Sequence, residues 1–356
     1  KYLKIKSKIY KENTGKEFDK NSKEVIYKKL KKENTKISLS SSAIFFESNN
    51  LYALSNVSNS PTLFCNENGY YSQYLSDRYG FNNPDKEWDN SQYEYMIVGD
   101  SYGHGACVNR NHDISSVLRT LSNKPVINLS FSGNGPLIEY ASLVEYLHKD
   151  VKYIIWLYFE GNDLEDLSTE MNNEILKKYL INKNFKQNLR DKQNLINDLV
   201  SDKIDHELKK REYTLLKFFK LTYLRHRIYL KFKKSKKNIT EGINLAKPWN
   251  EESIMVEFQN ILEKANKLSN YHNAKLIFVY LPKYNINKKS VRTNYPKIKS
   301  TVERLNIPFI SINDLVFKKE DDPLKLIPFG ISGHYNKEGY LKAANTIYKT
   351  IMNNNF

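Results

Sequence analysis

From residue 93 onward, short apolar runs alternate with longer amphipathic segments, and this alternation limits the folds open to the chain. The apolar runs lie at residues 93–98, 125–131, 152–159, 274–281 and 307–312. The amphipathic, helix-like segments lie at residues 113–122, 135–149, 251–271, 290–305 and 337–353. Strands that are apolar on both faces and alternate with helices indicate a parallel sheet covered on both sides. The sequence therefore predicts a three-layer α/β/α domain.

Polar residues follow three of the predicted strands, and a histidine precedes the last predicted helix. Ser101 follows the first strand, and Gly133 and Asn162 follow the next two. His334 lies just before the last helix, for which Asn336 is a suitable cap. Open parallel sheets bind ligands beyond the carboxyl ends of their strands, so we expect one shared site. A serine nucleophile, two oxyanion donors and a histidine base are the parts needed to break or transfer an ester.

Four blocks of the sequence resemble, in this order, the SGNH (GDSL-like) hydrolase superfamily. They are Gly99–Tyr102, Asn128–Gly135, Phe159–Asp163 and Gly333–Tyr340. The resemblance implies a flavodoxin-like α/β/α fold. It also implies that Ser101 is the catalytic nucleophile and His334 the catalytic base. The backbone N–H groups of Ser101 and Gly133 and the side-chain amide of Asn162 would then bind the oxyanion.

Two features depart from the pattern of the superfamily. Glu160 stands where the third block usually has a glycine. The acid that partners the histidine usually lies three or two residues before it, and these positions hold Ile331 and Ser332. Three alternatives remain open: another carboxylate reaches His334, a Ser–His dyad operates, or the site is impaired. The candidates for a displaced acid, all upstream of the histidine, are Asp314, Glu320, Asp321 and Asp322.

Other residues near the four blocks receive supporting roles. We predict substrate contacts for His104, Asn134 and Tyr335, and we interpret Asp100 and Asp163 as structural. The sequence contains no metal-ligand spacing, phosphate loop or dinucleotide fingerprint. We therefore expect neither a metal nor a cofactor.

The rest of the chain is interpreted as additions to this domain. Residues 1–92 form an N-terminal extension packed on the SGNH-like domain at 93–356; the extension is mostly loose before residue 40, apart from a helix near 22–32. We favour a structural wrap for its aromatic part over a substrate-binding role. A helical insertion interrupts the domain at about 165–247, and it could form a lid or wall over the site. Its basic segment 209–237 fits an anionic membrane surface, although packing on the domain is favoured.

The net charge and the two cysteines limit which binding partners and which cellular compartment are expected for the protein. The net charge of +16 over 356 residues favours acidic partners such as anionic polysaccharide or phospholipid headgroups, and no nucleic-acid recognition motif is present. Cys65 and Cys107 either pair or remain two buried thiols, the second being slightly favoured. No apolar run is long enough to cross a bilayer. Because the chain begins at Lys1 without a methionine, we expect it to be processed or truncated. Separately, we expect an extracytoplasmic bacterial protein, periplasmic or membrane-anchored, with a cytoplasmic location as the alternative.

Two functions compete at this stage. The first is a serine-dependent O-acyl esterase or O-acyltransferase that acts on a carbohydrate through an acyl-serine intermediate. The resemblance implies acetyl groups on a bacterial surface polysaccharide as the substrate class. The second is a non-catalytic carbohydrate-binding or scaffold protein on a degenerate SGNH fold. This second function is suggested by the absence of a carboxylate at the usual acid positions, which hold Ile331 and Ser332.

Overall fold

A computed structural model describes residues 2–211, 250–284, 294–354 and 356. Its centre is a five-stranded parallel sheet in the order β10-β9-β8-β6-β7. The strands are β6 (Gln92–Gly99), β7 (Val126–Asn128), β8 (Asp150–Phe159), β9 (Lys275–Leu281) and β10 (Phe309–Ser311). Numbered along the chain, this order is the 2-1-3-4-5 arrangement of flavodoxin-like folds. The predicted α/β/α fold and its five strands are confirmed.

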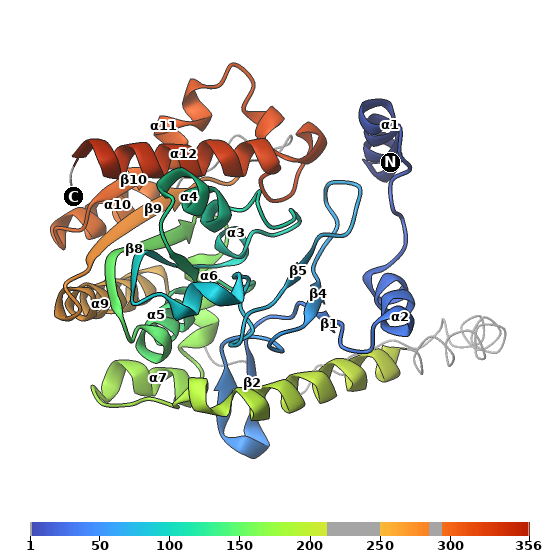
Figure 1. Ribbon diagram of the computed structural model, residues 1–356. Helices are drawn as coiled ribbons and strands as arrows, with labels where there is room; N and C mark the ends of the chain where they lie inside the picture. Colours follow the sequence, from blue (N-terminus) through green and yellow to red (C-terminus); the bar gives the residue numbers. More distant parts are fainter. Residues whose placement is uncertain (1, 212–249, 285–293, 355) are drawn as a thin grey trace, which may run out of the picture.

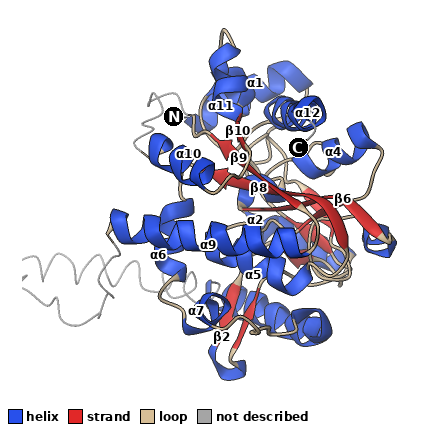
Figure 2. Ribbon diagram, turned by 90° about the vertical axis from the view of Figure 1, so that its left-hand side faces the viewer, coloured by secondary structure: helices blue, strands red, loops and turns tan. Residues whose placement is uncertain are grey.

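Helices cover both faces of this sheet, as Figure 2 shows. One face packs on α5 (Pro136–Tyr146), α9 (Glu251–Tyr271) and α10 (Tyr295–Arg304). The other packs on α4 (Ile114–Ser122) and α12 (Lys337–Asn354). Successive residues of a strand point to opposite faces, so Met96 and Val98 join the first core while Tyr95 and Ile97 join the second. Because both faces are buried, the strands β6, β8 and β9 are apolar after their first one to three residues.

The N-terminal extension is more regular than the sequence suggested. It contains α1 (Tyr2–Thr14), α2 (Lys23–Glu33) and five short strands. The three-stranded sheet has the order β1-β4-β5, formed by Ser38–Leu39, Pro61–Leu63 and Gln73–Leu75. The strands β2 (Ile44–Phe46) and β3 (Leu51–Ala53) form an antiparallel pair. The expectation of a mostly loose N-terminus outside α2 was wrong, because α1 is helical although none of its residues is buried.

The first half of the insertion packs on the domain and on the extension. It contains α6 (Asp163–Glu170), α7 (Glu174–Ile181) and a helix through residues 193–211. Leu167, Leu176 and Ile196 belong to the core cluster beneath α5. The basic segment 209–237 lies outside the described residues from position 212 onward, so its membrane role stays a prediction. Among the described helices, none is long and apolar enough to span a membrane.

Candidate active site

Ser101 stands at the first turn after β6, at the edge of the sheet where β6, β7 and β8 all end. It begins the short helix α3 (Ser101–His104), which Asp100 caps by accepting a hydrogen bond from the Tyr102 N–H at 2.8 Å. The turn is tight, because a Cβ added at Gly103 would lie 2.3 Å from Ser130 Oγ. Asp100 is fully buried, and its cap on α3 is in keeping with the structural role expected for it. The serine is thus held on a tight turn at the carboxyl ends of the strands.

His334 lies between Ser101 and a carboxylate. Its Nε2 is 2.8 Å from Ser101 Oγ, and its Nδ1 is 3.1 Å from Glu67 Oε2. The same carboxylate oxygen accepts a hydrogen bond from the His334 backbone N–H at 2.6 Å. Serine, histidine and acid therefore form a chain of hydrogen bonds with the geometry of a catalytic triad. One alternative left open by the sequence, a carboxylate from elsewhere in the chain, is the one observed.

Glu67 comes from the N-terminal extension, in the loop between β4 and β5. Figure 1 shows this loop extending from the small sheet toward the segments around α3. A glycine before the histidine suits this close approach, because Gly333 has a φ of +132° and a Cβ there would lie 2.5 Å from Glu67 Oε2. The interpretation of this aromatic segment as a structural wrap was therefore incomplete.

Three of the four acids proposed from the sequence make other contacts. Asp314 binds Tyr295 and Lys318, and Glu320 binds Lys325 and Lys342. Asp322 caps the turn that begins at Pro323. Within the described residues, the side-chain hydrogen bonds of the His334 ring go to Ser101 and Glu67. The prediction of an acid just upstream of the histidine, Asp321 included, was wrong.

The electrostatics of the pair favour an ion pair when the histidine accepts a proton. Burial opposes the charged imidazolium, but the hydrogen bond and negative charge of Glu67 outweigh it and raise the pKa of His334 above 6.5. Burial likewise opposes the Glu67 carboxylate, yet its hydrogen bonds and the charge of His334 hold its pKa below 4.5. Glu67 is therefore ionised at neutral pH and faces the ring nitrogen remote from Ser101.

The two predicted oxyanion residues lie in the loops that follow β7 and β8. Gly133 has a φ of +78°, and a Cβ there would lie 2.7 Å from Ser42 Oγ of the extension, so both backbone and neighbour demand glycine. Asn162 is the N-cap residue of α6, and its amide donates to the Asp166 carboxylate. An amide nitrogen carries two donors, so one N–H remains for a ligand. Glu160, which replaces the usual glycine, accepts a hydrogen bond from the Lys283 N–H at 3.1 Å.

The three predicted substrate contacts require correction, because His104, Asn134 and Tyr335 are each 0% exposed. Tyr335 donates its hydroxyl hydrogen bond to the Pro282 carbonyl at 2.9 Å. His104 Nδ1 accepts from the Ser132 N–H at 3.2 Å, and burial lowers the pKa of His104 to about 3. A neutral His104 thus supports the loop beside Gly133 from within. The three side chains lie in the interior of the protein, so a substrate in the site cannot contact them.

The cysteines form a disulfide, Cys65–Cys107, so the slightly favoured expectation of two thiols was wrong. The bond lies beside the triad: Cys107 Sγ, a Glu67 carboxylate oxygen and a His334 ring nitrogen are within 4.8 Å of one another. Such a group has the residue types of a metal site, but a disulfide sulfur offers no thiolate ligand.

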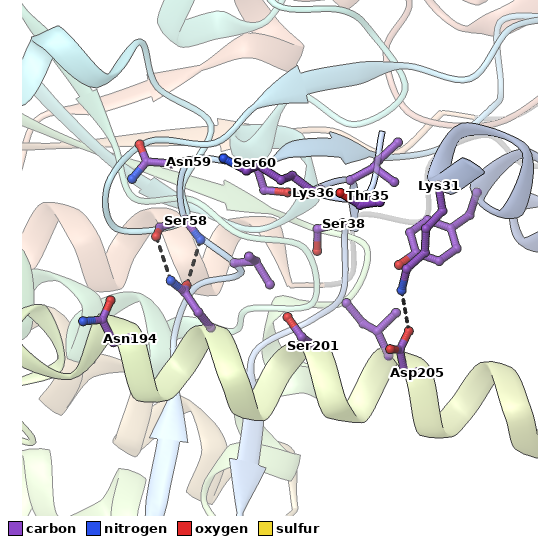
Figure 3. A pocket seen from close by; sticks show the side chains of 15 residues that line it. Lys31, Thr35, Lys36, Ser38, Ser58, Asn59, Ser60, Asn194, Ser201 and Asp205 are labelled. Atoms are coloured by element: carbon purple, nitrogen blue, oxygen red, sulfur yellow. Dashed lines mark hydrogen bonds and ion pairs between the residues drawn. The ribbon is translucent and has the colours of Figure 1, made fainter. Parts of the chain in front are cut away.

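A polar cavity of about 500 Å³ lies away from the triad, between the extension and the helix 193–211. Along its walls, Lys31 is paired with Asp205, as Figure 3 shows, and the distance between Nζ and Oδ1 is 2.8 Å. Asn197 accepts a hydrogen bond from the Ser58 N–H and donates one to Ser58 Oγ. It contains no pairing of a nucleophile with a base. Its contacts join the insertion to the extension.

The fold and the site define a class, an α/β/α protein with a Ser–His–Glu arrangement at the carboxyl ends of its strands. No protein-family profile and no curated protein matches the chain. Among solved structures, it is similar to a protein assigned to the lipolytic G-D-S-L family from Desulfitobacterium hafniense DCB-2, with a TM-score of 0.40 and 12% identity over 73% of this chain and 99% of that one.

Two further solved structures are similar to this chain, with comparably low sequence identities and TM-scores. One is a carbohydrate esterase family 2 enzyme with a carbohydrate-binding domain from Corynascus thermopiles (Myceliophthora fergusii), with a TM-score of 0.38 and 9% identity over 73% and 66% of the two chains. The other is the acetyl xylan esterase AlAXEase, with a TM-score of 0.36 and 11% identity over 72% and 99%. The roles of residues are argued from the geometry of this chain.

Proposed function

We propose that this protein is a serine-dependent O-acyl esterase or O-acyltransferase that acts on a carbohydrate. The observation that carries the proposal is the position of His334, 2.8 Å from Ser101 Oγ on one side and 3.1 Å from Glu67 on the other. A serine hydroxyl becomes nucleophilic only when a base accepts its proton, and the base must be held in one tautomer. Glu67 accepts the Nδ1–H and so leaves Nε2 free to face the serine.

The reaction follows from these contacts. His334 Nε2 takes the Ser101 proton while Oγ attacks the carbonyl carbon of an ester, and the tetrahedral intermediate places negative charge on the carbonyl oxygen. His334 then gives its proton to the departing alkoxide, which leaves as an alcohol, and an acyl-serine remains. Water or a sugar hydroxyl repeats the sequence in reverse, giving a free acid or a new ester. The Glu67 carboxylate stabilises the imidazolium in both halves.

The oxyanion is assigned to the donors around the serine. The backbone N–H groups of Ser101 and Gly133 and the remaining N–H of Asn162 are proposed to bind it. Each such donor is worth about 3 kcal/mol in the transition state. The non-catalytic alternative rested on the absence of an acid partner for His334. The contact between His334 and Glu67 removes that argument for it.

The carbohydrate substrate and the location outside the cytoplasm are further parts of the proposal. The net charge of +16 favours anionic polysaccharides. The disulfide favours an oxidising compartment, because such bonds are rare in the cytosol. An acetylated surface polysaccharide, as the SGNH resemblance implies, is consistent with both.

The test compares hydrolysis with transfer on one preparation. Wild type and Ser101→Ala are assayed on a short-chain nitrophenyl ester and on an O-acetylated oligosaccharide, with and without an unacetylated acceptor. We expect turnover that Ser101→Ala abolishes. Acetyl transfer to the acceptor would identify a transferase, and free acetate alone an esterase. Equal rates for wild type and Ser101→Ala on every donor would contradict the proposal.

A further inference from the structure

The loop that brings Glu67 to His334 is joined covalently to the turn that carries the serine. Cys65 lies two residues before Glu67, and its partner Cys107 lies six residues after Ser101. Cys107 Sγ is within 4.8 Å of both the Glu67 carboxylate and the His334 ring. The disulfide therefore connects the acid's segment to the nucleophile's segment directly beside the triad.

Most other contacts of this loop hold it to the extension itself. The loop is closed by two backbone hydrogen bonds, Phe64 N–H to Ser72 O and Ser72 N–H to Cys65 O, both 2.9 Å. Asp19, also in the extension, donates its N–H to the Gly69 carbonyl at 2.9 Å. These bonds shape the loop, but they do not fix its distance from His334.

Toward the α/β domain, the loop's contacts beyond the triad itself gather around Cys107. The Asn68 side-chain amide donates to the Cys107 carbonyl at 2.9 Å. Next to the loop, the Gln73 N–H donates to Asn109 Oδ1 at 3.2 Å. Both are single hydrogen bonds, each worth about 1 kcal/mol net. The disulfide is the covalent member of this group, and its Cys107 Sγ is within 4.8 Å of a Glu67 carboxylate oxygen.

The position of Glu67 is costly without such a tether. A carboxylate that leaves water loses hydration, and a partner must replace it. Ordering a loop also costs backbone entropy, about 1–2 kcal/mol per residue. A cross-link next to the carboxylate keeps it near the imidazole at high effective concentration, so most of the protein holds a complete triad.

We propose that the Cys65–Cys107 disulfide is a positioning element of the active site, which keeps Glu67 on His334 and makes acyl transfer depend on oxidation of this pair. The inference rests on the proposed esterase function. Without the bond, the loop samples positions in which His334 lacks its acid. Loss of the disulfide therefore lowers turnover through Glu67. The loss is smaller in a variant whose residue 67 is no longer a carboxylate that can stabilise the His334 imidazolium.

The test is a double-mutant cycle on the full chain. Cys65→Ala/Cys107→Ala, Glu67→Gln and their combination are compared with wild type on a nitrophenyl ester. We expect loss of the disulfide to lower kcat at least about tenfold in the wild-type background, but less than about twofold in the Glu67→Gln background. The pKa of His334, followed by NMR of its ring protons, should fall in the disulfide variant as it does in Glu67→Gln.

The same comparison is available without substitution of the cysteines if the double variant does not fold. Wild type and Glu67→Gln are reduced under native conditions with a chelator present, because a freed Cys107 thiolate beside His334 could bind metal. Reversible loss of activity in wild type, with little change in Glu67→Gln, supports the inference. An equal factor in both backgrounds, or no loss in wild type, overturns it. Activity that survives Ser101→Ala contradicts the proposed function instead.

Discussion

Replacement of Glu67 by glutamine removes one negative charge while it keeps nearly the same shape. The carboxylate oxygen is 3.1 Å from His334 Nδ1. At an effective dielectric constant of about 20, two unit charges at that distance attract by about 5 kcal/mol. This energy acts mainly on the transition state, in which the histidine carries a proton. It corresponds to about 10⁴ in rate, which is also what loss of the acid costs in a full triad.

Solvent reduces this figure, because the two side chains are 24% and 26% exposed. We therefore expect Glu67→Gln to lower kcat by about 10³ to 10⁴ with little change in KM. The acidic limb of the pH profile should also move. Glu67 raises the pKa of His334, so its removal lowers that pKa and lets the base act at lower pH.

The assay is steady-state hydrolysis of a nitrophenyl ester between about pH 5 and pH 9. Thermal unfolding by circular dichroism checks that the variant is folded, and Glu320→Gln serves as the matched control, since Glu320 binds lysines away from the triad. A loss below about tenfold, or an acidic limb that does not move, would show that His334 works without Glu67.

Three further predictions concern the oxyanion loops and the basic segment. Asn162→Ala should lower kcat by about 10² or more without loss of folding, and unchanged turnover would leave Asn162 as a helix cap only. Gly133→Ala should reduce activity as strongly, because Gly133 has a φ of +78° and a Cβ there would lie 2.7 Å from Ser42 Oγ. The matched variant Gly133→Ala/Ser42→Gly removes the contact and keeps the backbone strain, so it should recover little of the lost activity if the backbone angle is the main cause. The segment 209–237 should favour anionic over neutral vesicles in sedimentation, more so at low salt, and equal binding to both would contradict this.

The sequence predicted the sheet well, because fully apolar runs have few alternatives once helices flank them. The helix at Glu251–Tyr271 was predicted to the residue, since Asn250 caps it and its apolar face is continuous. Ser101 and His334 were found because each stands in a short local pattern. Helix α1 was missed because its apolar residues are sparse and none is buried.

Glu67 could not be found in the same way. It lies 267 residues before His334, in a loop with no motif of its own, and only the folded extension brings the two together. The nearest sequence signal was the cysteine two residues earlier, whose pairing with Cys107 would have placed the loop beside the serine. His104, Asn134 and Tyr335 were misjudged because nearness to a motif in sequence says nothing about which way a side chain points.

The central claim is that Ser101 is a nucleophile activated by His334 and Glu67. Its most direct test is covalent: the protein is incubated with a fluorophosphonate, and the adduct is mapped by peptide mass spectrometry over time. We predict one adduct, on Ser101, that forms rapidly in wild type, slowly in Glu67→Gln and at background rate in His334→Ala. Labelling that persists in Ser101→Ala, or that is equally fast in all three proteins, would contradict the account.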